Sequence, residues 1–132
     1  MRPGAKRGVL IVDDVADTRE LLAELFTHLG YHSMMANNGV EALARLREIR
    51  PDVIISDLMM EEMGGAVLIR HIDEDERLAG IPIILLTGSG KPKALEDLGA
   101  QADRVKTILT KPVSLVELQE AVGAAISDGA GS

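Results

Sequence analysis

Several side chains that could perform metal or phosphate chemistry stand where apolar runs of the sequence end. They comprise three carboxylates, a hydroxyl and an ammonium group: Asp13, Asp14, Asp57, Thr87 and Lys111. Clustered carboxylates repel one another and raise each other's pKa unless a cation joins them. A divalent cation that prefers oxygen ligands, Mg²⁺ or Mn²⁺, is the natural partner, and a lysine adds a second positive charge.

Asp57 is the candidate nucleophile of this set. A carboxylate can attack phosphorus and form an aspartyl phosphate. The transferring phosphoryl group spreads negative charge over its oxygens and therefore needs cations and donors around it. Lys111, Thr87 and a metal ion could supply them, so the set suits phosphoryl transfer onto Asp57. The sequence has no Gly-rich loop of the ATPase type, so ATP binding is not indicated.

Strands and helices must alternate along the chain to bring these residues together. Apolar runs predict strands over 9–12, 32–36, 52–57, 82–87 and 107–110. Helical spacing of apolar residues predicts helices over 16–29, 40–49, 66–78, 92–105 and 115–126. This alternation predicts an α/β fold, in which a parallel sheet carries five helices distributed over both faces. Ligands of such sheets bind beyond the carboxyl ends of the strands, which is where the candidate residues stand.

Three local signals support these boundaries. Gly30 stands where the cap that ends a helix is expected. Pro92 suits the first turn of a helix. Ser114, followed three residues later by Glu117, forms a capping box at the start of the last helix.

The composition fits one globular domain. The chain has 132 residues, of which 46% are hydrophobic and 27% charged. We expect an extension over 1–7, one domain over 8–126 and a flexible tail over 127–132. The net charge of −7 argues against direct nucleic-acid binding. The apolar run at 9–12 is too short for a signal peptide or for insertion into a membrane, and without cysteines there are no disulfides.

Four segments together resemble the receiver domains of response regulators, the CheY-like superfamily of two-component signalling. They are VLIVDD at 9–14, DVIISDLMM at 52–60, IILLTG at 83–88 and LTKP at 109–112. The resemblance covers nearly the whole chain, about 8–126. It implies the flavodoxin-like, doubly wound five-stranded parallel sheet with strand order 2-1-3-4-5.

The resemblance also implies a role for each residue. Asp57 would be the phosphoacceptor, Thr87 would sense the phosphoryl group, and Lys111 would contact it. The metal would be held by Asp14 directly, by Asp13 mostly through water, by Asp57 and by the backbone carbonyl of Met59. The Lys111–Pro112 peptide bond would be cis.

The partners implied are a sensor histidine kinase or a histidine phosphotransfer protein, and a downstream effector that the sequence does not identify. The domain would be a cytoplasmic phosphoprotein and not an enzyme, apart from its own phosphorylation and dephosphorylation. A homodimer is compatible with the sequence.

The sequence departs from the family pattern in four places. Glu61 replaces the common proline, and Gly64-Gly65 replaces a common Asp-Gly pair. Ile108 occupies the position of the usual switch aromatic, so a Thr–aromatic switch cannot operate in its usual form. The stretch from Gly99 to Lys111 is longer than usual, which predicts an extended fourth helix or following loop.

Three other interpretations stay open. Asp13 and Asp14 could be helix caps, although capping explains one acid and not three. The chain could be a Mg²⁺-dependent phosphohydrolase, but such enzymes commonly place a second acid two residues after the nucleophile, where Met59 stands. It could also be a receiver-like interaction module that is never phosphorylated, although no acid, threonine or lysine of the set is missing.

Overall fold

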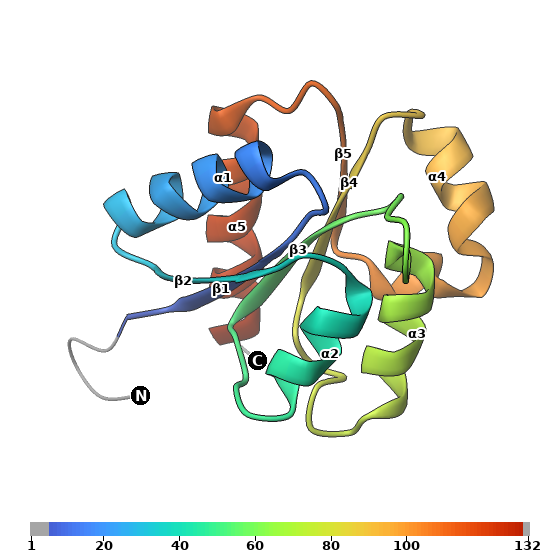
Figure 1. The fold of residues 1–132 in the computed structure, drawn as a ribbon, viewed down its shortest axis with the longest axis horizontal. Helices are drawn as coiled ribbons and strands as arrows, with labels where there is room; N and C mark the ends of the chain where they lie inside the picture. Colours follow the sequence, from blue (N-terminus) through green and yellow to red (C-terminus); the bar gives the residue numbers. More distant parts are fainter. Residues whose placement is uncertain (1–5, 131–132) are drawn as a thin grey trace.

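The computed structural model describes the backbone of residues 6–130 and the side chains of residues 6–127. The strands are β1 (Gly8–Val12), β2 (His32–Ala36), β3 (Val53–Asp57), β4 (Ile83–Thr87) and β5 (Thr107–Thr110). The α-helices are α1 (Ala16–His28), α2 (Gly39–Leu46), α3 (Gly65–Glu74), α4 (Lys91–Leu98) and α5 (Leu115–Ala130), and a 3₁₀ helix, η1 (Gly99–Arg104), follows α4. Strands and α-helices alternate as predicted (Figure 1).

The five strands form one parallel sheet in the order β2-β1-β3-β4-β5, which confirms the predicted topology. The register aligns the ends of neighbouring strands. Val12 lies opposite both Ala36 and Ser56, and Thr87 lies opposite Thr110. The residues that follow these positions therefore gather at one edge of the sheet.

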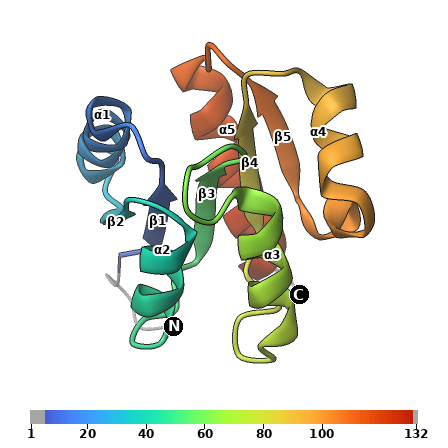
Figure 2. The same ribbon diagram turned by 45° about the vertical axis from the view of Figure 1, so that its right-hand side comes forward.

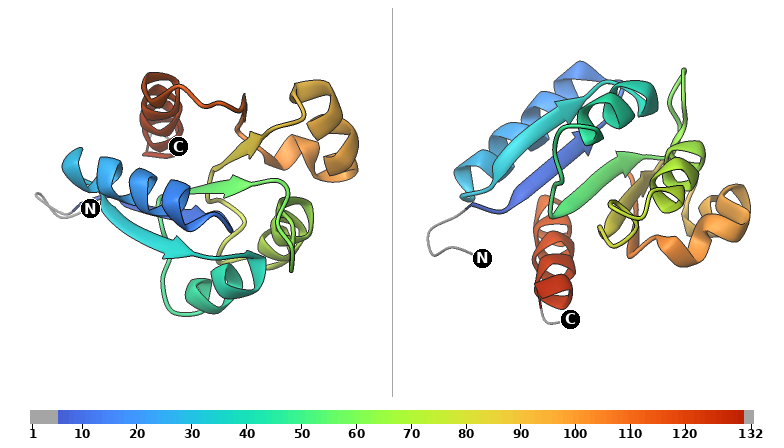
Figure 3. Two further views of the ribbon diagram at one scale, coloured as in Figure 1. Left: turned by 45° about the horizontal axis from the view of Figure 1, so that its top comes forward. Right: turned by 90° about the horizontal axis from the view of Figure 1, so that it is seen from below.

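Each strand contributes side chains to two separate apolar cores, because successive side chains point to opposite faces of the sheet. Val9 and Ile11 pack on the face that α1 and α5 cover, while Leu10 and Val12 pack on the face that α2, α3 and α4 cover. Figure 2 shows the helices on both sides of the twisted sheet, and in the left view of Figure 3 α5 lies on one side and α2 on the other. Strands buried on both faces read as continuous apolar runs, which is why the sequence predicted them.

Two helices end earlier than predicted, because side-chain hydrogen bonds replace the backbone hydrogen bonds of the expected last turns. The second helix, expected to reach residue 49, ends at Leu46, whose carbonyl accepts a hydrogen bond from the Arg77 guanidinium. The third, expected to reach residue 78, ends at Glu74. The Asp75 carboxylate then accepts from the Arg77 backbone N–H at 2.9 Å and forms a turn.

The fourth and fifth helices also differ from prediction. The α-helix expected over 92–105 ends at Leu98, because Gly99 takes a φ of +54°. The chain continues as η1, so the extra length before Lys111 forms a 3₁₀ helix. The last helix runs to Ala130, beyond its expected end at Ile126, and takes in residues expected in the tail. The rest of that tail and most of the extension at 1–7 lie outside the described residues.

The signals at Gly30 and Pro92 are confirmed, as is one of the two hydrogen bonds of the predicted capping box. Gly30 has a φ of +95°, a conformation that suits glycine, directly after the end of α1. Pro92 lies in the first turn of α4, and the Ser114 hydroxyl accepts from the Glu117 N–H at 3.2 Å. None of the helices within residues 6–130 combines the length and apolar character that crossing a membrane requires.

Candidate functional site

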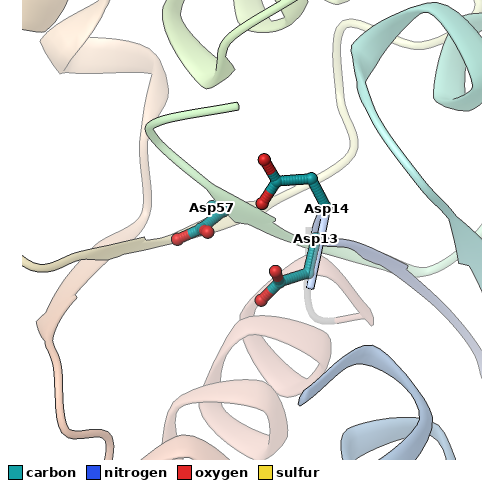
Figure 4. A group of neighbouring side chains, drawn as sticks. All are labelled: Asp13, Asp14 and Asp57. Atoms are coloured by element: carbon teal, nitrogen blue, oxygen red, sulfur yellow. The ribbon is translucent and has the colours of Figure 1, made fainter. Parts of the chain in front are cut away.

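Three acids meet where β1 and β3 end. Asp13 and Asp14 follow β1, and Asp57 is the last residue of the neighbouring β3. One oxygen from each carboxylate lies within 4.8 Å of the others, and Figure 4 shows the three side chains beside one another. The structure thus brings together the acids that the sequence singled out.

Asp13 is held in place but incompletely satisfied. Its side chain belongs to a residue only 1% exposed, and its Oδ1 accepts from the Val15 backbone N–H at 2.9 Å. Its Oδ2 is buried and has no hydrogen-bond partner among the described residues. The capping interpretation is wrong for both acids, because the N-cap of α1 is Val15 and no side chain caps this helix; Asp13 Oδ1 instead closes a turn with the Val15 N–H. An orphaned carboxylate oxygen beside two further acids fits a divalent cation that binds through oxygen.

Asp57 is paired with Lys111. The Lys111 ammonium lies 2.7 Å from Asp57 Oδ1, and the Asp57 side chain is almost fully buried. Burial away from water raises the pKa of Asp57, and the nearby charges of Asp13 and Asp14 raise it further. The hydrogen bond and charge of Lys111 lower this pKa, but burial is the larger influence. The carboxyl group thus sits where an added cation would favour its ionised form.

Thr87 and Lys111 are joined through the backbone. The Lys111 N–H donates to the Thr87 carbonyl at 2.7 Å, because β4 and β5 run side by side to this point. Thr87 is 1% exposed, and its hydroxyl oxygen accepts from the Ser89 N–H at 3.1 Å. Asp57 lies opposite Leu86, one residue before Thr87. The Lys111–Pro112 bond is cis, as expected.

The loop after Asp57 carries Met59, whose side chain is 68% exposed. The expected metal ligand is its backbone carbonyl, and this role stays a prediction. Met60 and Met63 pack against the core beneath the loop. The loop closes tightly, because Gly65 donates its N–H to the Leu58 carbonyl at 2.8 Å.

Arg19 is a residue that sequence reasoning did not single out. Its Nη1 donates to the backbone carbonyl of Asp13 at 2.8 Å and to Asn37 Oδ1 at 3.1 Å. The only signal in the sequence was its position in the first turn of a helix, where a positive charge is unfavourable to the helix dipole.

Comparison with known proteins identifies the family. A family model described as the response regulator receiver domain matches residues 9–123. The chain belongs to the response regulator receiver family. It is a receiver domain of two-component signalling, and this membership does not favour the phosphohydrolase and interaction-only alternatives.

Relatives of this receiver domain differ in length. The polar-differentiation response regulator DivK of Brucella anthropi is 29% identical, over 92% of this chain and 98% of its own. The phosphate regulon transcriptional regulatory protein PhoB of Pseudomonas aeruginosa is 37% identical over 83% of this chain, but that match spans only 47% of PhoB. The receiver domain thus corresponds to nearly all of one relative and to about half of the other.

Solved structures agree on the fold of the receiver domain. The signal receiver domain of a histidine kinase from Syntrophus aciditrophicus matches with a TM-score of 0.84 and 34% identity, over 92% of this chain and 91% of that one. The chemotaxis protein CheY4 of Vibrio cholerae matches with a TM-score of 0.84 and 29% identity, over 92% of this chain and 99% of that one. Receiver domains generally bind Mg²⁺ at an acidic pocket, and the three acids of this chain form such a cluster.

A pocket of about 230 Å³ opens beside the site. It is lined by Thr18, Leu21, Leu22, Leu86, Lys111, Pro112, Val113 and Leu115. Leu21, which lines the pocket, is 57% exposed, and Val116, the residue after Leu115, is 65% exposed. The receiver domain therefore presents an apolar surface directly next to the Lys111 side of the acid cluster.

Proposed function

We propose that Asp57 accepts a phosphoryl group from a phosphohistidine, carried by a sensor histidine kinase or a histidine phosphotransfer protein, in a Mg²⁺-dependent reaction. One observation carries the proposal. The Asp13 carboxylate has an oxygen within 4.8 Å of oxygens of Asp14 and Asp57, and its Oδ2 is buried without a hydrogen-bond partner among the described residues, while Lys111 binds Asp57. Such an arrangement suits a cation and a group rich in negative charge.

The chain's own residues would divide the work. Lys111 binds Asp57 Oδ1 and favours the ionised carboxylate, which leaves Oδ2 to attack phosphorus. As the new O–P bond forms, the P–N bond to the donor imidazole breaks and its electron pair stays on that nitrogen. The Thr87 hydroxyl oxygen accepts from the Ser89 N–H, so its O–H can donate a hydrogen bond to a phosphoryl oxygen.

Asp13, Asp14, Asp57 and the Met59 carbonyl would hold the divalent cation. When bound, the cation would supply positive charge that offsets the acids and the phosphoryl oxygens. Outside its own phosphorylation and dephosphorylation the domain would have no enzymatic role.

The donor protein would cover the apolar surface beside the site. A phosphohistidine has to reach Asp57 from the open edge of the sheet, and the pocket lined by Leu21, Lys111 and Leu115 borders that approach. Phosphorylation would then change which effector protein the domain binds. We propose that the domain acts in the cytoplasm, because histidine kinases take their phosphoryl group from ATP and ATP is a cytoplasmic compound.

The test is the intact mass of the protein after treatment with acetyl phosphate, with and without Mg²⁺. We expect the mass of one phosphoryl group to be added to the wild type only when Mg²⁺ is present, and nothing to be added to Asp57→Asn. Asp103→Asn, which alters an exposed acid in η1, is the matched control and should behave as the wild type. A phosphorylated Asp57→Asn protein would remove Asp57 as the acceptor.

A further inference from the structure

Arg19 ties two loops together at the rim of the acid cluster. The same nitrogen, Nη1, donates to the Asp13 carbonyl at 2.8 Å, in the turn between β1 and α1, and to Asn37 Oδ1 at 3.1 Å, in the turn between β2 and α2. The side chain is half-buried. Its backbone is fixed in turn, since the Arg19 N–H donates to the Val15 carbonyl at 3.0 Å.

These contacts fix the main chain of Asp13 from several directions. The Asp13 N–H donates to the Ala36 carbonyl at 3.2 Å, its Oδ1 accepts from Val15, and its carbonyl accepts from Arg19. Only the first two are contacts that the strand and the turn provide by themselves. The third depends on one long side chain, and it fixes the peptide unit that links Asp13 to Asp14.

The charge of Arg19 works against a cation site. A guanidinium close to the acids repels a divalent cation, so removal of the charge alone would tighten Mg²⁺ binding. The charges that shift the pKa of Asp57 are those of Lys111, Asp13 and Asp14. The charge of Arg19 is not one of them. Any favourable effect of Arg19 on the site therefore comes from the position that it imposes on the backbone.

We propose that Arg19, anchored on Asn37, is a positioning residue that holds Asp13 and Asp14 ready for the divalent cation. The proposal rests on the proposed Mg²⁺ site. Residues that orient metal ligands without touching the metal typically contribute about 10- to 100-fold to its affinity. For Arg19, which acts through the backbone of the ligands, we expect the lower end of that range.

The experiment measures Mg²⁺ affinity by isothermal titration calorimetry on the full chain, with folding checked by circular dichroism. Arg19→Met keeps the stem of the side chain but removes its donors and charge, and we expect it to weaken Mg²⁺ binding about tenfold. Arg19→Lys keeps a donor and the charge and should return most of the lost affinity. Asn37→Ala, which removes the anchor and leaves Arg19 intact, should weaken binding in the same direction.

Arg47→Met is the matched control, since it removes the same charge from the exposed C-terminal end of α2. It should bind Mg²⁺ as the wild type does. An affinity in Arg19→Met equal to or tighter than that of a Mg²⁺-binding wild type would overturn this inference and leave the proposed function standing. So would wild-type affinity in Asn37→Ala, or Arg19→Lys no better than Arg19→Met. A wild type that binds no Mg²⁺ would overturn both proposals.

Discussion

At the scale of single residues, the site is organised around opposing influences on one carboxyl group. Burial raises the pKa of Asp57, and the Lys111 ammonium at 2.7 Å lowers it. Burial is the larger influence, so ionising this carboxyl group costs more than it does in water, and a bound cation would lower that cost. A raised pKa of this kind is typical of functional sites, which supports the proposed role of Asp57 as phosphoacceptor.

This raised pKa predicts how the stability of the Mg²⁺-free protein depends on pH. Because the pKa of folded Asp57 lies above its ordinary value of 3.8, the folded state keeps the proton over a range where the unfolded state has lost it. As pH rises through that range, Asp57 lowers the free energy of unfolding. Asp57→Asn has no such group, so we expect it to gain stability over the wild type between pH 3.8 and the raised pKa, and to keep that gain at higher pH.

Urea unfolding of both proteins across this pH range, without divalent cations, measures the difference. Asp103→Asn again serves as the control, since its carboxylate is exposed. A stability difference between Asp57→Asn and the wild type that shrinks with rising pH would show that the pKa of Asp57 is lowered in the folded state.

The sequence was sufficient to find the acids, Thr87 and Lys111, because each stands at the end of an apolar strand. It was not sufficient to find Arg19. The Arg19 side chain contacts Asn37, eighteen residues away along the chain, and no spacing rule links the two. Such contacts depend on how two turns lie in space, which a strand pattern does not determine.

At the scale of elements, the strands were easier to predict than the ends of the helices. A strand buried on both faces is indicated by a continuous apolar run such as residues 83–86. The end of α3, by contrast, depends on the Asp75 carboxylate, which accepts the Arg77 N–H in place of a continued helical turn. The end of α4 depends on the positive φ of Gly99. Periodicity alone carries neither piece of information.

The loop that carries Met59 depends on a close approach of backbone at Gly65. A Cβ atom added to Gly65 would lie 2.7 Å from the Asp57 carbonyl oxygen and 3.0 Å from Leu58 Cα. Backbone cannot yield as a flexible side chain can, so we expect Gly65→Ala to lower the free energy of unfolding by about 1–3 kcal/mol. It should also weaken Mg²⁺ binding, because the loop after Asp57 must shift.

Gly123→Ala in α5 is the matched control for this prediction. A Cβ atom there meets nothing within 4 Å, and alanine is the better helix former, so we expect a gain of about 1 kcal/mol. Chemical denaturation measures both variants. If Gly65→Ala proved as stable as the wild type, the close approach of the loop would not constrain it.

At the scale of the whole molecule, the fold acts as a frame that gathers distant segments at one edge. Asp13, Asp57 and Lys111 come from three different strands or strand ends, and the strand order places β1, β3, β4 and β5 next to one another. The alternation of strands and helices predicted a parallel sheet with helices on both faces, and the resemblance to receiver domains supplied the strand order. The change that phosphorylation would pass to an effector protein was not predictable. The family commonly has a switch aromatic at the position of Ile108, and here Ile108 packs against the core, so the usual Thr–aromatic switch gives no guide.

A frame that holds acids together without a cation should gain stability when the cation binds. The folded state gathers the three carboxylates and the unfolded chain does not, so the proposed Mg²⁺ site exists only in the folded state. Linkage then predicts that Mg²⁺ at about 100 times its dissociation constant raises the free energy of unfolding by about 2.7 kcal/mol. Urea unfolding with and without Mg²⁺, at constant ionic strength, measures this gain. Asp14→Asn should lose most of it and Asp103→Asn should keep it, whereas an equal gain in Asp14→Asn would place the stabilising cation elsewhere on the molecule.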